Sequence, residues 1–344
     1  MPQHAVSTNQ QSSMKHILNQ LFDHQKLSKE QAREVLINIS QDKYNPSQLA
    51  AFISVYLMRN ISVDELSGFR DALLELCIPI DFEGKSVIDL CGTGGDSKNT
   101  FNISTLASFV VAGAGYHVAK HGNYGVSSVS GSSNVLEYFG FKFTNATDTL
   151  KKQMDAANIA FLHAPLFHPA LKSVGPIRRE LGVKTFFNML GPLVNPAKPQ
   201  YQSVGVFSLK LARLYQYIHE ASHKKYAIIH ATDGYDEVSL TSEVKLITNK
   251  GEQLVQPNYF GMPQYKQEDI FGGETVKEAA EIFMNILDQK GSQAQNDVVT
   301  ANAALAIQCF DQNKDIQTCV GEAQESLMTG KAKTSFENLL KTSL

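Results

Sequence analysis

From Lys85 onward, short apolar runs alternate with glycine-rich or polar loops and with segments of helical periodicity. The first run, Val87–Leu90, leads directly into a loop that contains three glycines. Further strand candidates follow at residues 116–119, 159–162, 203–207, 226–230 and 244–248. Short apolar runs are typical of buried strands, and strands that alternate with helices indicate a largely parallel sheet covered on both faces.

The residues before Lys85 have the periodicity of amphipathic helices instead, beginning with the apolar spacing of Met14–Phe22. Three later helix starts are indicated by polar caps: Ser28 with Gln31, Asn45 with Pro46, and Ser62 with Glu65. Residues 168–199 are again helical and are interrupted by prolines. We expect this segment to fold back onto the N-terminal helices.

These patterns predict an α/β protein with two domains, each discontinuous in the sequence. The small all-helical domain is expected to comprise residues 13–83 with 166–198. The larger α/β domain, with a mostly parallel sheet flanked by helices, is expected to comprise residues 84–165 with 199–344. A length of 344 residues suits about two domains of ordinary size.

Composition excludes several classes of function. The chain has 31 Lys and Arg against 34 Asp and Glu, a formal net charge of −3, which argues against a protein that binds nucleic acid through a basic surface. No apolar run is long enough to span a membrane, and the polar start lacks the apolar core of a signal peptide. The four cysteines form no zinc or C-x-x-C spacing. We therefore expect a cytoplasmic protein with no nucleic-acid partner and no membrane partner.

Two loops that follow predicted strands have the composition of phosphate-binding loops. Residues 89–96 read D-L-C-G-T-G-G-D, and Asn102–Thr105 then opens a helix. Residues 120–132 combine a lysine, a histidine, an amide and several hydroxyls with small residues. Backbone N–H groups of glycine loops and helix N-termini bind anions, but a tight turn or a surface linker would have a similar composition. Their place after strands favours a ligand site, since ligands of open α/β sheets bind there.

Two charged pairs are further candidates. Asp236 and Glu237 supply the oxygen ligands that Mg²⁺ prefers, although an isolated Asp-Glu pair is more often a solvated turn. Arg178 and Arg179 could bind an acidic substrate, although helical arginines next to Glu180 are more often surface ion pairs. The chain shows no nucleophile elbow and no Cys-His couple.

Taken in order, five motifs make the chain similar to a known family. They are G-T-G-G-D (92–96), N-I-S-T (102–105), K-H-G-N (120–123), I-R-R-E-L-G (177–182) with F-N-M-L-G-P-L-V-N-P (187–196), and D-G-Y-D-E-V-S (233–239). In this order, over nearly the whole chain from about residue 14, the sequence resembles the anthranilate phosphoribosyltransferases. The resemblance implies transfer of a phosphoribosyl group from phosphoribosyl pyrophosphate to the amine of anthranilate, in tryptophan biosynthesis. It also implies Mg²⁺ as cofactor, the fold of the nucleoside-phosphorylase-like phosphoribosyltransferases, and a homodimer formed through the helical domain.

The resemblance also assigns roles to residues. Donor-binding roles fall on Gly92, Gly95, Asp96, Thr100, Asn102, Ile103, Ser104, Thr105, Lys120, His121, Gly122, Asn123, Ser127, Ser128 and Ser132. Roles near anthranilate fall on Gly92, His121, Asn123, His168, Arg178, Gly191 and Pro192, and metal-binding roles on Ser104, Asp236 and Glu237. No residue is assigned as an acid or base, because the weakly basic aromatic amine needs no deprotonation before attack.

The chain departs from the family pattern at three positions. Tyr124 stands where the family usually has Arg, Val129 where Lys is common, and Asn134 where Asp is common. We expect activity to be retained despite the loss of two cations beside the phosphate loop. Two alternatives are a pyrimidine-nucleoside phosphorylase-like enzyme and a non-enzymatic nucleic-acid-binding relative of the same fold. The intact glycine and Asp-Glu motifs and the negative net charge favour the transferase.

Overall fold

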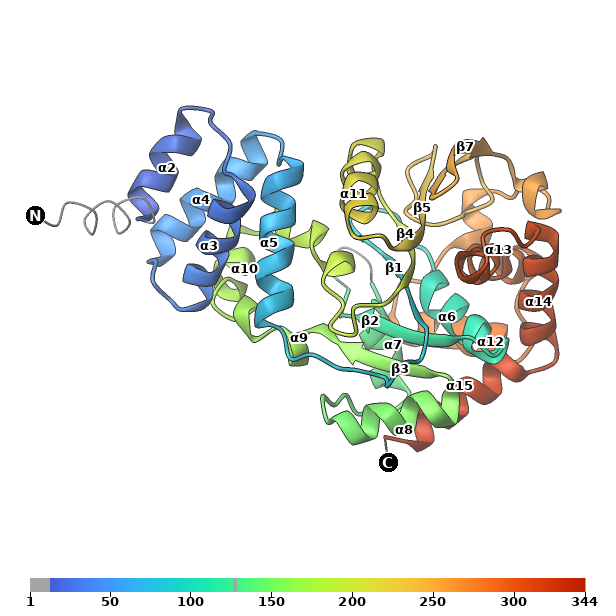
Figure 1. The fold of residues 1–344 in the computed structure, drawn as a ribbon. Helices are drawn as coiled ribbons and strands as arrows, with labels where there is room; N and C mark the ends of the chain where they lie inside the picture. Colours follow the sequence, from blue (N-terminus) through green and yellow to red (C-terminus); the bar gives the residue numbers. More distant parts are fainter. Residues whose placement is uncertain (1–12, 126–128, 344) are drawn as a thin grey trace, which may run out of the picture. The chain divides into compact units, whose positions relative to one another are not determined.

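The computed structural model describes residues 13–125 and 129–343, which form two units (Figure 1). The helical unit comprises the chain up to Pro79 together with Phe167–Pro196. The chain therefore leaves this unit after Pro79 and returns to it at Phe167. The α/β unit comprises Ile80–Leu166 and continues from Ala197 to the C-terminal helix. In the part of the chain that the structure describes, no helix is both long enough and apolar enough to cross a membrane.

The helical unit is built on four helices whose first turns are capped by side chains. They are α2 (Met14–Phe22), α3 (Lys29–Ser40), α4 (Pro46–Met58) and α5 (Val63–Leu76). The three predicted caps are confirmed: the side chains of Ser28, Asn45 and Ser62 each accept a hydrogen bond from a backbone N–H of the first turn. The returning segment adds short elements: η1 (Pro169–Leu171), α10 (Gly175–Leu181), η2 (Phe186–Met189) and η3 (Gly191–Leu193).

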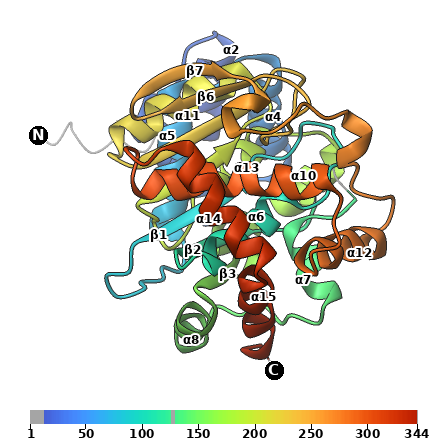
Figure 2. The same ribbon diagram turned by 90° about the vertical axis from the view of Figure 1, so that its right-hand side faces the viewer.

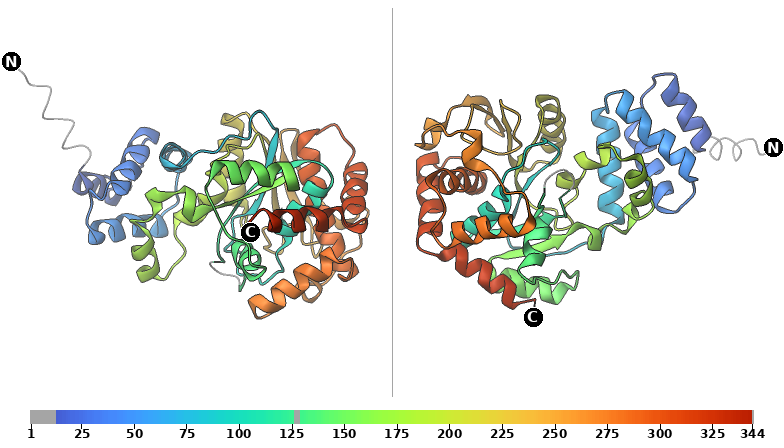
Figure 3. Two further views of the ribbon diagram at one scale, coloured as in Figure 1. Left: turned by 90° about the horizontal axis from the view of Figure 1, so that it is seen from below. Right: turned by 180° about the vertical axis from the view of Figure 1, so that it is seen from behind.

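An aromatic cluster fixes the returning segment, yellow-green in Figure 3, to the first helices. Phe186 of η2 stacks on Phe69 of α5 with ring centroids 4.8 Å apart, and its ring lies 4.9 Å from that of Tyr56 in α4. Phe52 of α4 meets Phe186 edge-on at 6.2 Å. Aromatic pairs at these distances stabilise a core beyond the burial of their area, which explains why a segment separated by some 90 residues returns to this unit.

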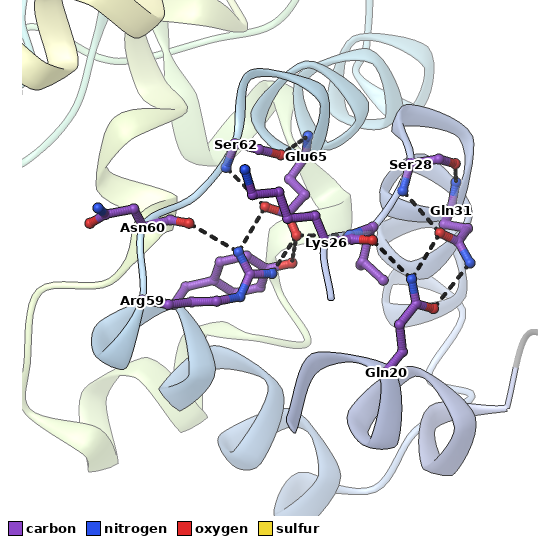
Figure 4. Close-up of polar contacts among 10 residues, drawn as sticks. Gln20, Lys26, Ser28, Gln31, Arg59, Asn60, Ser62 and Glu65 are labelled. Atoms are coloured by element: carbon purple, nitrogen blue, oxygen red, sulfur yellow. Dashed lines mark hydrogen bonds and ion pairs between the residues drawn. The ribbon is translucent and has the colours of Figure 1, made fainter. Parts of the chain in front are cut away.

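A buried carboxylate ties α5 to the elements before it (Figure 4). Glu65, whose side chain is fully buried, forms an ion pair with Arg59 and accepts hydrogen bonds from the backbone N–H groups of Leu27 (3.0 Å) and Ser62 (2.9 Å). The Tyr56 hydroxyl donates to the same carboxylate over 3.3 Å. Glu65 is therefore both the third residue of a capping box and the centre of a buried polar network.

The α/β unit contains a seven-stranded sheet with the order β3-β2-β1-β4-β5-β6-β7. The strands are β1 (Val87–Gly92), β2 (His117–Gly122), β3 (Ile159–His163), β4 (Tyr201–Gly205), β5 (Lys225–Ala231), β6 (Val244–Thr248) and β7 (Gly251–Val255). The first five are parallel, while β6 and β7 run antiparallel to their neighbours, so the predicted mostly parallel sheet is confirmed. The chain builds outward from β1 in both directions, which makes the carboxyl end of β1 a topological switch point.

Helices cover both faces of this sheet. They are α6 (Ile103–Gly113), α7 (Ser132–Tyr138), α8 (Thr147–Ala157), α11 (Leu209–Ala221), α12 (Val276–Leu287), α13 (Gln293–Phe310), α14 (Ile316–Met328) and α15 (Lys331–Lys341). Three short pieces complete the chain: α9 (Ala164–Phe167), η4 (Pro257–Phe260) and η5 (Gln267–Ile270). Figure 2 shows α13 and α14 beside α6, and these helices share one hydrophobic core with the sheet. Both α6 and α13 are buried along most of their length, which makes them rigid supports for the loops that they contact.

Candidate active site

The glycine loop after β1 closes around the carboxylate of Asp236. The N–H of Gly94 donates to Asp236 Oδ2 over 2.7 Å, in a backbone conformation with a φ of +63° that favours glycine. A Cβ on Gly92 would lie 2.6 Å from the same oxygen. A side chain at position 92 would therefore displace the Asp236 carboxylate, and the loop after β1 meets the loop after β5.

Gly205, the last residue of β4, belongs to the same junction, although the sequence reasoning did not select it. A Cβ on Gly205 would lie 1.3 Å from the Asp236 carbonyl oxygen, and the Gly205 carbonyl accepts a hydrogen bond from Thr93 N–H over 2.9 Å. The signal in the sequence was a glycine inside an apolar strand, a pattern that often marks a close backbone approach.

Three carboxyl groups gather at this junction and perturb one another. Burial, and then the charge of Asp96, raise the pKa of Asp236 to about 7, and these two carboxyl groups are hydrogen-bonded to each other. Burial likewise raises the pKa of Asp96. Burial and the charge of Asp236 raise the pKa of Glu237 well above its ordinary value, while the charge of Lys120 and a hydrogen bond with Ser104 act in the opposite direction. Carboxylates that repel one another in this way create a site that a cation would stabilise.

The donor set at this junction fits a hard divalent cation that shares its ligands with a substrate. Asp236, Glu237 and Ser104 offer oxygen atoms, the ligands that Mg²⁺ prefers. Across residues 13–125 and 129–343, no three His, Cys, Asp or Glu side chains form a ready-made metal cage. Mg²⁺ is commonly held by one or two carboxylates together with phosphate oxygens and water, a pattern to which Asp236 and Glu237 could contribute.

The start of α6 lies between the two predicted phosphate loops. Asn102 precedes α6 without capping it, and its Nδ2 group instead donates to the carbonyl of Ser130 over 2.9 Å. The first-turn N–H groups of α6 consequently receive no side-chain cap, which suits a helix N-terminus that binds an anion. Ile103 and Thr105 are buried, so a ligand would meet their backbone rather than their side chains.

Lys120 is buried within β2 rather than extended toward solvent. Its Nζ donates to the Leu90 carbonyl over 2.7 Å, and only 2% of the residue is exposed. Burial lowers its pKa, while the charges of Asp89, Cys91 and Glu237 raise it. Lys120 therefore opposes the negative charge of Glu237 from within the sheet. The next residue, His121, is also buried, and its N–H donates to Asp89 Oδ1 over 3.1 Å.

The second loop is closed by Asn134, one of the departures from the family pattern. Its Oδ1 accepts hydrogen bonds from the N–H groups of Gly125 and Gly131, each over 2.9 Å. A Cβ on Gly131 would lie 2.2 Å from Gly125 N, so the two ends of the loop touch. The Asn123 carbonyl accepts from Ser132 Oγ over 3.3 Å and thereby fixes the start of α7. The sequence-predicted residues Ser127 and Ser128 lie outside the described residues.

Tyr124 and Val129, the other departures, differ in their surroundings. The Tyr124 hydroxyl donates to Glu137 Oε1 over 3.2 Å, and its ring meets His163 edge-on with centroids 5.1 Å apart. Tyr124 thus anchors the loop to α7 and to the end of β3. Val129 is 42% exposed and no structural reason for it is evident.

The sequence-predicted acceptor residues His168, Arg178, Gly191 and Pro192 lie in the helical unit. Arg178 of α10 is half-buried, and burial lowers its pKa. Its Nη2 donates to Asn188 Oδ1 over 3.3 Å, and its guanidinium lies 5.3 Å from the centroid of the Phe187 ring. Asn188, which lies in the F-N-M-L-G-P-L-V-N-P motif but has no predicted role of its own, therefore orients the arginine. His168 and Pro192 are buried, whereas Gly191 is exposed.

Comparison with known protein families identifies the general class of this chain. The chain matches the glycosyl transferase family in both of its parts, the helical bundle domain over residues 15–77 and the a/b domain over residues 84–333. The glycine loops and acidic turn thus lie in the a/b domain of a glycosyl transferase.

Relatives then define the family more closely. The anthranilate phosphoribosyltransferase of Flavobacterium johnsoniae is 58% identical over 331 residues, which cover 96% of this chain and 100% of that protein. That of Christiangramia forsetii is 57% identical over 330 residues, which cover 96% and 99%. The crystal structure of the Thermus thermophilus enzyme is 29% identical, with a TM-score of 0.88 over 94% of this chain and 98% of that one. The chain belongs to the anthranilate phosphoribosyltransferase family.

A more distant structure shares the fold. The Saccharomyces cerevisiae anthranilate phosphoribosyltransferase in complex with PRPP and Mg is 24% identical, with a TM-score of 0.88 over 97% of this chain and 99% of that one.

Proposed function

We propose that this chain transfers the 5-phosphoribosyl group from phosphoribosyl pyrophosphate to the amine of anthranilate. The products are N-(5-phosphoribosyl)anthranilate and pyrophosphate, in the second step of L-tryptophan biosynthesis from chorismate. The observation that carries this proposal is the junction of Asp236 with the glycine loop after β1, at the switch point of a parallel sheet. Membership of the anthranilate phosphoribosyltransferase family supports it.

The α/β unit would bind the donor. Backbone N–H groups of the first turn of α6, beside the loop at Gly92–Asp96, would supply hydrogen-bond donors for the pyrophosphate. The loop at Lys120–Asn123, with Ser132, would contact the sugar and phosphates. Asp236, Glu237 and Ser104 would hold Mg²⁺, which supplies positive charge to the leaving pyrophosphate. The raised pKa values of the two acids and the complex of the yeast relative with PRPP and Mg support this assignment.

The helical unit would bind the acceptor. Arg178 would pair with the carboxylate of anthranilate, held in place by Asn188 and Phe187. His168 and the turn Gly191–Pro192 of the same unit would also contact anthranilate. The remaining roles that the resemblance assigns near anthranilate fall on Gly92, His121 and Asn123 of the α/β unit. The amine nitrogen forms a bond to the anomeric carbon as the carbon–oxygen bond to pyrophosphate breaks, and the nitrogen then loses a proton. Because no general base is assigned, the residues of this chain would accelerate the reaction by holding the amine nitrogen close to the anomeric carbon.

Two further features support a homodimeric assembly and a cytoplasmic location. Phe22 at the end of α2 and Leu57 and Met58 at the end of α4 are exposed apolar side chains of the helical unit, Met58 at 89%. They support a homodimer formed through this unit. All four cysteines are buried thiols, which supports a location in the cytoplasm.

One assay tests the function directly. Purified protein is mixed with Mg²⁺, phosphoribosyl pyrophosphate and anthranilate, and the fluorescence of anthranilate is followed. We expect the fluorescence to fall only when all components are present. Unchanged fluorescence at high enzyme concentration would overturn the proposal, and release of base from a pyrimidine nucleoside by inorganic phosphate would favour a phosphorylase instead.

A further inference from the structure

The backbone next to the two acidic residues is held by a single side chain from a distant helix. Asn302 of α13 accepts a hydrogen bond from the N–H of Val238 through Oδ1, over 3.0 Å. Its Nδ2 group donates to the carbonyl of the same Val238 over 2.9 Å, and to the carbonyl of Val298 over 2.8 Å. Val238 is completely buried and Asn302 is 3% exposed, so water does not compete for these bonds.

The other side of this segment is confined by β4. The Asp236 carbonyl occupies the space that a side chain at Gly205 would need. Residues 236–238 belong to no helix and no strand, so regular hydrogen bonding does not fix their backbone. Their position is therefore set by the close approach of Gly205 on one side and by the amide of Asn302 on the other.

An asparagine side chain has the hydrogen-bonding groups needed to hold the backbone of Val238. A side-chain amide offers an acceptor and two donor hydrogens, and the three contacts of Asn302 use all of them. Alanine would leave a buried N–H and a buried C=O without partners, and aspartate would keep only the bond to the N–H. Because α13 is buried along most of its length, its backbone holds the side-chain amide of Asn302 in a fixed position.

We infer that Asn302 is a positioning residue for the carboxylates of Asp236 and Glu237, and that it sets the affinity of the site for phosphoribosyl pyrophosphate with Mg²⁺. This inference rests on the proposed function. Asn302 acts through the backbone of Val238 and contacts no reacting atom. Its loss should therefore weaken donor binding selectively and leave the acceptor side unchanged.

The test compares N302A and N302D with the unaltered protein by calorimetric titration. Phosphoribosyl pyrophosphate is titrated in the presence of Mg²⁺, without anthranilate, so that the readout is binding rather than turnover. We expect N302A to weaken binding by at least tenfold. N302D keeps the acceptor for Val238 N–H, but its buried carboxylate faces the carbonyls of Val238 and Val298, so it should weaken binding at least as much. The KM for anthranilate should change less than twofold in both. Whichever variant folds tests the inference.

Ser335 supplies the matched control. Its Oγ donates to the Ala157 carbonyl over 2.6 Å, so it is also a buried side chain that bonds to backbone in the α/β unit, but on α15. S335A should lower the melting temperature without changing donor affinity. A folded Asn302 variant with unchanged donor affinity, or an S335A variant that loses donor affinity equally, would overturn the inference. Failure of the unaltered protein to bind the donor would instead count against the proposed function.

Discussion

Several glycines of the α/β unit are required by the atoms around them rather than by their backbone angles. Gly131 has a φ of −82°, which any residue can adopt, yet a Cβ there would lie 2.2 Å from Gly125 N and 2.6 Å from the Tyr124 carbonyl carbon. Both obstacles are backbone atoms, which cannot move aside by a change of rotamer. One added methyl group must therefore open the loop that Asn134 closes.

We predict that G131A raises the KM for phosphoribosyl pyrophosphate about tenfold or more while the protein stays folded, because the loop moves and the sheet does not. Steady-state kinetics and thermal unfolding measure the two effects. G321A is the control, since Gly321 lies in α14 with open space around it. G321A should stabilise the protein by roughly 0.5–1 kcal/mol and leave the KM unchanged. A G131A enzyme with the KM of the unaltered protein would contradict the predicted role of this loop.

Some residues of the candidate site can be predicted from local sequence patterns, and others cannot. The glycine loop and the pair Asp236–Glu237 are visible as local patterns, because several chemically suggestive residues stand together after a strand. Asn302 is not visible in this way, and the only local signal for Gly205 is a glycine inside a strand. Each contacts the acidic turn from more than 30 residues away, and in the sequence each is an ordinary glycine in a strand or asparagine in a helix. Their importance arises from packing, which a local pattern does not encode.

At the level of elements, the helix starts were predicted well, whereas one of the two edge strands was missed. The caps at Ser28, Asn45 and Ser62 satisfy backbone N–H groups locally, so their residue types indicate them without any tertiary contact. Strand β7 was not predicted, because its first four residues are exposed and it has no apolar run. The capping role of Glu65 was predicted, but its ion pair with Arg59 depends on how the helices pack.

The Glu65 network makes a prediction about pH. Burial opposes ionisation of Glu65, but hydrogen bonds from Arg59 and from the backbone outweigh it and lower the pKa of Glu65 in the folded state. A lowered pKa means that the carboxylate stabilises the fold above its unfolded pKa of about 4.3, and that this contribution disappears as the pH falls through the folded value. E65Q should therefore cost roughly 3 kcal/mol near neutral pH, and the cost should shrink in acid.

Denaturant unfolding of E65Q at a series of pH values measures this difference. E75Q is the matched control, because Glu75 pairs with Arg33 on the surface of the same unit. Its cost should stay below about 1 kcal/mol. A cost of E65Q that stays the same from pH 7 down to the most acidic pH at which the protein still folds would show that the charge of Glu65 does not contribute to stability.

At the scale of the whole molecule, the exposed apolar side chains Phe22, Leu57 and Met58 of the helical unit are expected to contact a second copy of the chain. We predict a dimer of the 37.9 kDa chain in solution and its dissociation by M58E, because a charge would be buried in the interface. Light scattering after gel filtration measures the mass. M328E, which places the same charge on an exposed methionine of the α/β unit, should stay dimeric. A monomeric unaltered protein, or a dimeric M58E, would contradict this arrangement.

Donor binding by the α/β unit and acceptor binding by the helical unit can be tested separately. Asp236 and Glu237 lie in the α/β unit and Arg178 lies in the helical unit, so the two substrates should respond to different substitutions. The direct test is initial-rate kinetics with both substrates varied, for E237Q and R178A side by side. R179A is the control for R178A, because Arg179 is the exposed neighbour on α10.

We predict that E237Q raises the KM for phosphoribosyl pyrophosphate and the Mg²⁺ concentration for half-maximal rate, with little change in the KM for anthranilate. R178A should raise the KM for anthranilate roughly 10- to 100-fold, as expected for a lost charge-assisted hydrogen bond, with little change for the donor. R179A should resemble the unaltered protein. If either variant instead shifts both KM values to the same extent, the division of the substrates between the two units is wrong.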